Sequence, residues 1–301
     1  MITGNDIQAL VDLFEKRQVF LYHACQLIDF ESYISLGGIP SRALLESRQV
    51  EFTSFQTDAV DRENSMWDKV FVNLSDFGSP FAQGAKSVLN PYGPILFKLR
   101  PAALLEASDV AVCLWSAGAK GFNRERESLN TLEEIDRLFL HPSNSGTPKS
   151  TDIKYRARLA AEFGRQKTKT QDPEISCTVP NGVLSTQHVS FVGVDPYIVN
   201  NQKLLDWVNI IKQRYSVQFP VYERSHFRDR SRSSFYNEIA EQIDEQTPTL
   251  QALTHNNACS RSLRDWAEKI LPLEWQFERY ASYLRDGTLK PMKEGVMYRN
   301  H

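Results

Sequence analysis

The sequence predicts an α+β protein, and three observations support this class. Short apolar or alternating runs typical of strands recur along the chain, at residues 19–23, 69–74, 95–99, 110–115, 174–179, 189–194 and 217–222. Segments with helical spacing separate some of these runs, and the sequence beyond about residue 237 has only helical character. We therefore predict a mixed or antiparallel sheet with flanking helices and a C-terminal helical extension.

The first elements are predicted in the order helix, strand, helix and turn. Residues 6–17 carry apolar side chains at helical spacing. Residues 19–23 form an apolar run with aromatic members, which indicates a strand with His23 at its end. The glycine pair at residues 37–38 then stops a helix over residues 27–36, because glycine adopts the left-handed conformation that ends helices.

The middle of the chain alternates between strands and polar stretches. Residues 50–67 are polar and mixed and indicate no regular element, whereas turn-forming residues predict a loop at residues 141–150. A helix is expected over residues 155–166, and it gives way to a polar loop before the strand that begins at Glu174. A further helix is expected over residues 204–215.

Length, composition and charge bound the type of protein. The 301 residues exceed the roughly 100 to 150 of a typical domain, so we divide the chain into a main domain, residues 1–225, and a helical extension, residues 226–301. Hydrophobic residues make up 41 % and charged residues 24 %, which indicates a folded globular protein. The net charge of −2 supplies no global attraction to nucleic acid, so any such affinity has to come from local basic patches.

Several kinds of protein lack support in the sequence. No apolar run approaches the roughly 20 residues that span a bilayer, and the N-terminus does not resemble a secretory signal. The widely spaced cysteines suit a reducing cytoplasm, disfavour a metal site and are interpreted as buried small apolar groups: Cys25, Cys113, Cys177 and Cys259. Neither glycine-rich phosphate-binding pattern is present, so the sequence does not support nucleotide binding of the Rossmann or P-loop kind.

Four segments, taken in order, resemble one known family. They are residues 20–39 with a Tyr-His pair and a Gly-Gly-apolar turn, residues 70–81 with a Ser-Pro loop, the glutamate-led strand at residues 174–180, and residues 219–224. Together they are similar to the DarT family of DNA ADP-ribosyltransferases, which are toxins of bacterial toxin–antitoxin pairs. The chain departs from the family's pattern at Ala24, Cys25 and Asn73, and its last 70 or so residues have no counterpart in it.

The resemblance implies a fold and an activity. The fold would have the split sheet of ADP-ribosyltransferases, and the enzyme would consume NAD to modify a base in single-stranded DNA or RNA, as a toxin or phage-defence effector held in check by an antitoxin. The helical extension has enough aromatic area to bind such a partner. Two other readings stay open: a protein-directed transferase or NAD glycohydrolase, and a non-catalytic nucleic-acid-binding module.

The proposed chemistry needs a carboxylate. Cleavage of the bond between nicotinamide and ribose leaves positive charge on the ribose, which a neighbouring carboxylate stabilises. Glu174 is the first candidate, because it begins a strand directly after a polar loop. Glu162 is the second, in a segment whose letters are closer to the family's Ala-Glu segment but which is expected to lie within a helix.

Other residues are candidates for holding NAD. His23 can donate a hydrogen bond that fixes the pose of the dinucleotide. A guanidinium can bind the pyrophosphate in two-pronged fashion, and Arg62 best fits the family's catalytic arginine by its order in the chain, with Arg42 and Arg48 as competitors. Two serines in the loop after residue 74 are candidates for the nicotinamide amide: Ser75 and Ser79.

Two basic segments are candidates for binding nucleic acid. Residues 222–236 interleave arginines with aromatic residues, a mixture that pairs phosphates and stacks bases, and its candidate residues are Arg224, Arg228 and Arg230. A second set precedes Glu174 and is expected to bring a strand toward the reacting ribose: Arg165, Lys167 and Lys169.

Overall fold

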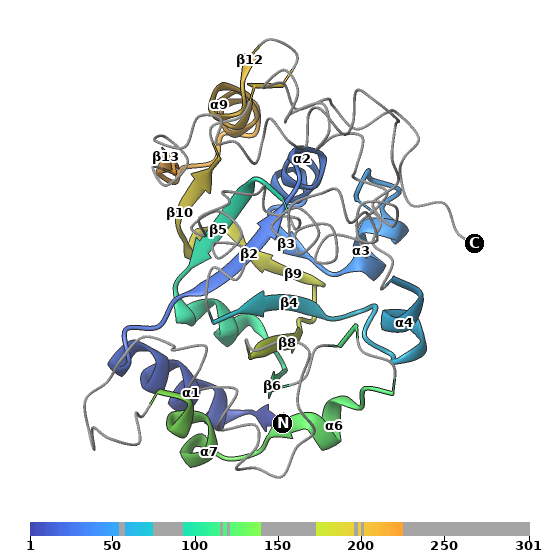
Figure 1. Ribbon diagram of the computed structural model, residues 1–301, viewed down its shortest axis with the longest axis vertical. Helices are drawn as coiled ribbons and strands as arrows, with labels where there is room; N and C mark the ends of the chain where they lie inside the picture. Colours follow the sequence, from blue (N-terminus) through green and yellow to red (C-terminus); the bar gives the residue numbers. More distant parts are fainter. Residues whose placement is uncertain are drawn as a thin grey trace, which may run out of the picture.

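The structure, a computed structural model, describes residues 1–53, 58–74, 93–114, 117–118, 121–139, 173–195, 198–199 and 202–224. Within these residues one sheet of nine strands dominates the molecule (Figure 1). Eight of the strands follow the order β1 (Ile2–Thr3), β6 (Asp109–Cys113), β8 (Glu174–Thr178), β4 (Val70–Asn73), β2 (Leu21–Cys25), β5 (Ile95–Leu99), β10 (Val189–Val194) and β13 (Val221–Glu223). The ninth, β7 (Ser128–Leu129), pairs with β6.

The sheet is mixed. Its described pairs are antiparallel except for β10 and β13, which run parallel. Two small two-stranded sheets accompany it: β3 (Gly38–Pro40) with β9 (Val183–Ser185), and β11 (Ile198–Val199) with β12 (Gln202–Lys203). The predicted α+β class with a mixed sheet and flanking helices is thereby confirmed.

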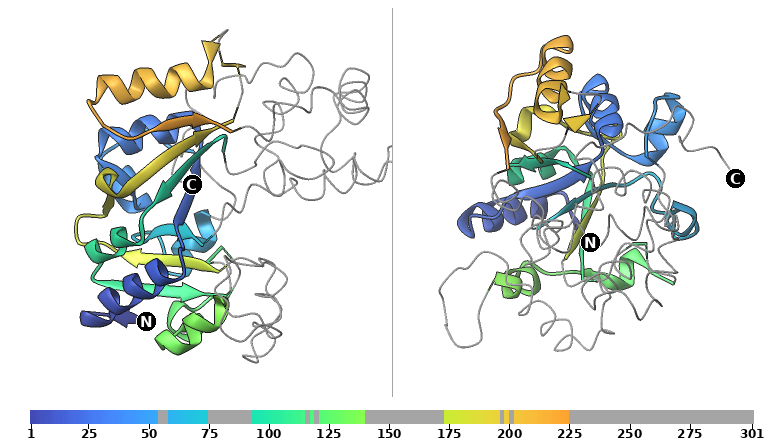
Figure 2. Two further views of the ribbon diagram at one scale, coloured as in Figure 1. Left: turned by 90° about the vertical axis from the view of Figure 1, so that its left-hand side faces the viewer. Right: turned by 45° about the horizontal axis from the view of Figure 1, so that its top comes forward.

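Helices flank the sheet at both of its ends. The helices of the described residues are α1 (Asn5–Lys16), α2 (Leu27–Ser35), α3 (Arg42–Ser47), α4 (Asp58–Glu63), α6 (Arg124–Glu127), α7 (Leu132–Asp136) and α9 (Leu204–Arg214). Three short 3-10 helices connect elements: η1 (Pro101–Glu106), η2 (Arg137–Phe139) and η3 (Thr186–His188). Helices α2 and α9 pack against one another beside β5 and β10, while α1 and α7 lie together at the opposite end (Figures 1 and 2).

The two faces of the sheet differ in burial, because side chains alternate along each strand. One face, which we name the covered face, lies under α2, and Phe30 of that helix stacks on Phe97 of β5 with ring centroids 5.4 Å apart. Most strand residues on this face are fully buried: Leu21, Val70, Val72, Ile95, Phe97, Leu99, Ile175, Cys177, Val192 and Val194. The other face, named the open face, carries half-buried residues such as Tyr22 and Lys98 on β2 and β5. On β4 and β6 the same face is covered by Met66, Ala117 and Phe122, which pack with Phe71, Ala111 and Cys113.

The sheet opens between β2 and β4. These two strands pair only at Tyr22 and Asn73, whereas β2 pairs with β5 along its whole length and β4 pairs with β8 along its whole length. Figure 1 shows β2 and β4 diverging from this point toward α3 and α4. The opening divides the sheet into a β2–β5–β10–β13 half and a β4–β8–β6 half, as the resemblance to split-sheet enzymes implies.

Most predicted elements are present, with three corrections. His23 lies in the middle of β2 and not at its end, because the strand extends to Cys25. The polar stretch at residues 50–67 contains α4, a short helix that was not predicted because its residues show little apolar periodicity. The last predicted strand, residues 217–222, is shorter and begins only at Val221.

The glycine pair after α2 has the predicted role and a second one. Gly37 takes a φ of +85°, the left-handed conformation that follows the end of the helix. Gly38 begins β3, where a Cβ atom would lie 1.9 Å from the carbonyl oxygen of Leu184 in β9. The first glycine therefore ends α2, and the second lets β3 approach β9.

Candidate functional site

His23 occupies the opening between β2 and β4. Its side chain lies on the covered face, where its Nδ1 is 2.8 Å from the carbonyl oxygen of Phe71 and its Nε2 is 3.4 Å from the hydroxyl of Tyr33. The ring of Tyr33, from α2, lies against the His23 ring with centroids 5.5 Å apart. A neutral ring with its proton on Nδ1 satisfies both contacts, since it donates to Phe71 and accepts from Tyr33. The histidine side chain thus connects β4 to β2 where their backbones no longer pair.

The charge state of His23 agrees with this arrangement. The pKa of His23 is lowered to about 4, mainly by burial and also by the charge of Arg42, although the hydrogen bond to the Phe71 carbonyl opposes these two effects. The imidazole is therefore neutral near pH 7. In this state it positions a neighbouring group through hydrogen bonds and carries no charge of its own.

Arg42 faces the same region from the first turn of α3. Its guanidinium donates to the carbonyl oxygen of Thr53 at 2.6 Å and lies 5.1 Å from the centre of the Phe52 ring. Burial acts to lower the pKa of Arg42, but Tyr33 and the carboxylates of Asp58 and Asp29 raise it above its usual value. The arginine is thus a permanent positive charge held among acidic groups.

Three acidic residues surround this arginine, and sequence analysis did not identify them. Asp29 is buried and accepts from the backbone N–H groups of Gln26, at 3.1 Å, and Thr53, at 2.6 Å. Burial and the neighbouring Asp58 raise the pKa of Asp61 to about 6, against the opposing effect of Arg42. Asp58 and Asp61 are three residues apart on one helix, which is the only sequence signal that indicated a shared environment.

Arg62 and Arg48 are the other two candidate arginines for NAD. Arg62, from α4, is 3.0 Å from a carboxylate oxygen of Glu46 in α3 and stacks 3.6 Å from the centre of the Trp67 ring. The indole nitrogen of Trp67 donates to the other oxygen of Glu46 at 2.9 Å, so these three side chains tie α3 to α4. Arg48 is the exposed residue at the end of α3.

Glu174 begins β8, as predicted, and lies between two strands. It is the register partner of Asn73 in β4 and of Cys113 in β6. Its carboxylate accepts from the backbone N–H of Ala117 at 2.8 Å. Its side chain therefore points to the face of the sheet that holds Asn73 and Tyr22.

His23 and Glu174 do not point to the same face. Tyr22, Asn73 and Glu174 are successive register partners, and directly opposed residues share a face. His23 follows Tyr22 in the strand and so points the other way, toward α2. The two side chains therefore lie on opposite faces of the sheet, whereas Arg42 lies close enough to His23 for its charge to affect the histidine.

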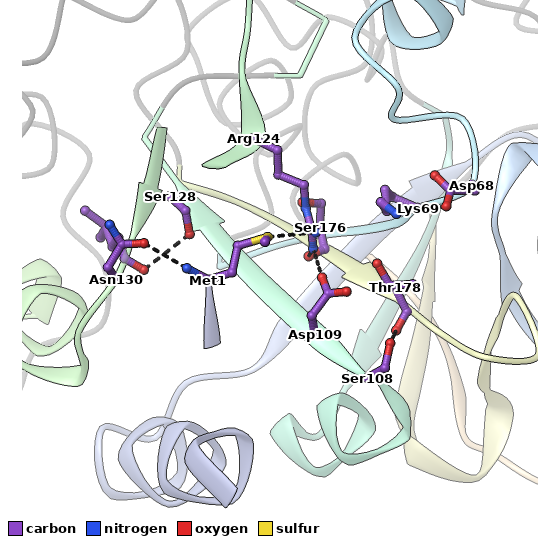
Figure 3. Close-up of polar contacts among 11 residues, drawn as sticks. Met1, Asp68, Lys69, Ser108, Asp109, Arg124, Ser128, Asn130, Ser176 and Thr178 are labelled. Carbon is purple, nitrogen blue, oxygen red and sulfur yellow. Dashed lines mark hydrogen bonds and ion pairs between the residues drawn. The ribbon is translucent and has the colours of Figure 1, made fainter. Parts of the chain in front are cut away.

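An arginine that sequence analysis did not single out contacts β8, the strand that Glu174 begins. Figure 3 shows Arg124 of α6 reaching β8, where it donates to the hydroxyl oxygen of Ser176 at 2.9 Å and to the carbonyl oxygen of Ser176 at 2.8 Å. It also forms an ion pair with Asp109 of β6. These contacts join α6 to two strands, which indicates a structural role for Arg124.

Arg224 is part of a buried ion pair. It is 8 % exposed, and its Nε lies 2.5 Å from a carboxylate oxygen of Asp195, which is fully buried. The aliphatic part of its side chain lies close to Gly193, where a Cβ atom would be 3.1 Å from it. The guanidinium is therefore largely enclosed by the protein, and the contact of Arg224 with nucleic acid stays a prediction.

The other predicted site residues lie outside the described residues. They are Glu162 among the acids, Ser75 and Ser79 among the candidates for holding NAD, and Arg165, Lys167, Lys169, Arg228 and Arg230 among the candidates for nucleic acid. The predicted helical extension, residues 226–301, lies outside them as well. Within the described ranges no cluster of three or more potential metal ligands occurs, and none of the helices is long and apolar enough to cross a membrane.

Comparison with known proteins finds distant structural likenesses. The chain is similar to the DarTG of Thermosipho africanus, solved in complex with ADP-ribose, with a TM-score of 0.39, 10 % identity, and 69 % of this chain and 50 % of that chain covered. The chain thus spans half the length of that protein. It is also similar to the DarT of Thermus sp. 2.9, solved in complex with ADP-ribosylated single-stranded DNA, with a TM-score of 0.40, 12 % identity, and 69 % and 95 % covered. Both proteins carry the name of the family that the four sequence segments resemble.

Searches by sequence add nothing to these likenesses. No family model matches the chain, and no curated protein matches it.

Proposed function

We propose that the chain is an NAD-consuming transferase that attaches ADP-ribose to a base in single-stranded nucleic acid, as a toxin or defence effector restrained by an antitoxin. The observation that carries the proposal is the opening between β2 and β4, because it holds His23 from the first of the four segments that resemble DarT proteins. Arg42 approaches the same opening closely enough for its charge to lower the pKa of His23.

The cluster around Arg42 suits a dinucleotide with a charged pyrophosphate. A guanidinium binds two phosphate oxygens at once, and the acidic neighbours of Arg42 hold it in position until the ligand competes for it. Neutral His23 and the Tyr33 hydroxyl supply hydrogen bonds for the uncharged part of NAD, such as a ribose or the nicotinamide amide. We therefore assign NAD positioning to His23 and Arg42, with Arg48 and Arg62 as the other candidate arginines.

The reaction is a displacement at the ribose carbon. The bond between this carbon and the nicotinamide nitrogen breaks, nicotinamide leaves with the electron pair as a neutral molecule, and positive charge develops on the ribose. A nitrogen of the target base forms the new bond and loses its proton. A carboxylate stabilises the developing cation, and removal of such a group typically slows a reaction by about 10²- to 10³-fold.

Two glutamates are candidates for stabilising the ribose cation, and the register of the sheet weakens the case for the first of them, Glu174. Glu174 points away from the face that holds His23, and its carboxylate is bonded to the Ala117 backbone. Glu162 is the alternative, on the grounds of its sequence segment. We therefore propose that one of these two carboxylates stabilises the ribose cation and that their separate substitution identifies it.

The test is mass spectrometry of single-stranded DNA and RNA oligonucleotides after incubation with NAD. The expected product is an adduct heavier by one ADP-ribose, lost in either Glu174→Gln or Glu162→Gln and retained in the other. Label that appears on protein would show a protein-directed transferase, and free ADP-ribose alone would show a glycohydrolase. Oligonucleotide binding with no release of nicotinamide would contradict an enzymatic role and indicate a binding module.

A further inference from the structure

Aromatic side chains gather around one lysine on the open face of the sheet. Lys98, in β5, has its ammonium nitrogen 3.7 Å from the centre of the Phe20 ring, 5.1 Å from that of Phe191 and 6.0 Å from that of Tyr22. Tyr222, in β13, extends the group, since its ring meets that of Phe191 edge to face at 5.8 Å. We name these five residues the aromatic platform.

The register explains why side chains from four parts of the chain meet here. Phe191 and Tyr22 are both partners of Lys98, on its two sides in the sheet. Tyr222 is opposite Gly193, which has no side chain to separate its ring from that of Phe191. The platform is therefore built on regular strands, which hold its members in fixed positions.

The platform is more accessible than the opposite face of the same strands. Tyr222 is 58 % exposed, and Phe20, Tyr22, Lys98 and Phe191 are half-buried. By contrast, Phe97 and Val192, which alternate with Lys98 and Phe191, are fully buried. Large aromatic rings left at a surface in this way typically mark a binding site.

The side chains of the platform suit a ligand in which negative charges alternate with flat rings. The ammonium group of Lys98 is partly desolvated by its neighbours, which lowers its pKa, so an anion at this position meets a cation that water screens less than usual. Rings stack on any nucleobase, and a cation among them suits a phosphate. A single nucleic-acid strand presents both, with a phosphate between successive bases.

We infer that the aromatic platform binds single-stranded nucleic acid, with bases stacked on its rings and a phosphate beside Lys98. This inference rests on the proposed function and names a surface for its nucleic-acid substrate on the face of the sheet opposite to His23, away from the residues assigned to NAD. The same cross-strand row continues from Lys98 through Tyr22 and Asn73 to Glu174, which lies three strand spacings, or roughly 14 Å, from Lys98. The platform itself lies on the β2–β5–β10–β13 half, whereas on the β4–β8–β6 half Met66, Ala117 and Phe122 pack on the same face.

The test compares two exposed tyrosines. Tyr222→Leu removes a platform ring, and Tyr215→Leu removes a ring that is 38 % exposed at the end of α9, beyond the platform. Affinity for a fluorescent single-stranded oligonucleotide, measured by anisotropy with the full chain, should fall roughly 5- to 150-fold in the first variant and stay unchanged in the second. Lys98→Gln should lower the slope of log affinity against log salt by about 0.7, the value for one phosphate contact with a single strand.

The outcomes separate the platform from the proposed enzyme. Unchanged affinity in both Tyr222→Leu and Lys98→Gln would overturn the platform, whether or not the wild-type protein modifies oligonucleotides. Self-association that is present in the wild type and lost in Tyr222→Leu, with unchanged oligonucleotide affinity, would assign this face to a second copy of the chain and overturn it too. Platform-dependent binding without any ADP-ribose adduct would instead overturn the proposed function and leave the platform in place.

Discussion

The two faces of β2, β5 and β10 use the same strands for different purposes. On the covered face, Phe97 and His23 pack under α2, and polar contacts there are specific and enclosed. On the open face, Lys98 and Phe191 remain half-buried among other rings. Alternate residues of one strand can therefore contribute to a core on one face and to a recognition surface on the other. Each face can be tested by substitutions that leave the other unchanged.

The largest effect is expected for a ring on the covered face. Phe97→Ala should destabilise the protein by about 3 to 5 kcal/mol, because it leaves a cavity between Phe30, Tyr33 and Phe219. Urea denaturation measures the change through the midpoint at constant slope. Phe191→Ala, on the open face, is the matched control and should destabilise by less than half as much. Equal losses in the two variants would show that the faces do not differ in packing.

A smaller loss of stability is expected when the buried ion pair of Arg224 and Asp195, beside the platform, is broken. Arg224→Met should destabilise by about 3 kcal/mol, because it leaves the fully buried Asp195 carboxylate without its closest cation. The double variant Arg224→Met with Asp195→Leu should recover most of this stability in the same urea measurement. Oligonucleotide affinity below the unfolding transition should stay within about twofold of wild type, and a large loss would support the nucleic-acid role first predicted for Arg224.

Sequence patterns were sufficient to predict the regular strands. They were insufficient to predict which side chains of neighbouring strands meet on one face of the sheet. The run at β5 is predicted with its observed bounds, because it is apolar and bracketed by prolines. Its single charged residue, Lys98, carried no signal, since the rings that surround it come from residues 20, 22 and 191 and meet only through strand pairing. A period of two along one strand does not reveal which rings its neighbours contribute.

The candidate site shows the same limit. His23 and Arg42 were identified, and the structure brings them together. Glu174 was also identified, but the face to which it points depends on the pairing of β8 with β4 and of β4 with β2. Asp29, Asp58 and Asp61 were missed, because isolated acidic residues in short helices resemble solvated surface charges until burial and the proximity of Arg42 are known.

A moderate effect with a defined pH dependence is expected at Asp61, on the covered side. Its folded pKa is about 6 against an ordinary 3.8, so between these values the folded state binds more protons and the wild type gains stability from this group as the pH falls. Asp61→Asn removes that gain. Relative to wild type, the variant should therefore lose about 1 kcal/mol between pH 7 and pH 4.5 in urea denaturation, because the roughly 2 kcal/mol that the shift implies is reduced for partial exposure of the group.

In the wild type, the free energy of unfolding should depend on pH less steeply than Asp61 or His23 alone would make it. His23 has a folded pKa of about 4 against an ordinary 6.5, so the unfolded state binds more protons between these values and stability falls as the pH falls. The two groups thus act in opposite directions over nearly the same range. A pH-independent difference between wild type and Asp61→Asn would contradict the assignment of a raised pKa to Asp61.

The smallest effect is expected at Arg62, which is only partly enclosed. Arg62→Lys keeps the charge that faces Glu46 but loses the flat stacking on Trp67, and Arg-to-Lys exchange at a stacked site is not conservative. Because both charged side chains are about one-third exposed, the stability loss should stay below about 1 kcal/mol. If Arg62 also holds the NAD pyrophosphate, the KM for NAD should rise by about tenfold or more with little change in kcat, since such a contact binds ground state and transition state alike. Unchanged KM would leave Arg62 as a tie between α3 and α4 and assign the pyrophosphate to Arg42 or Arg48.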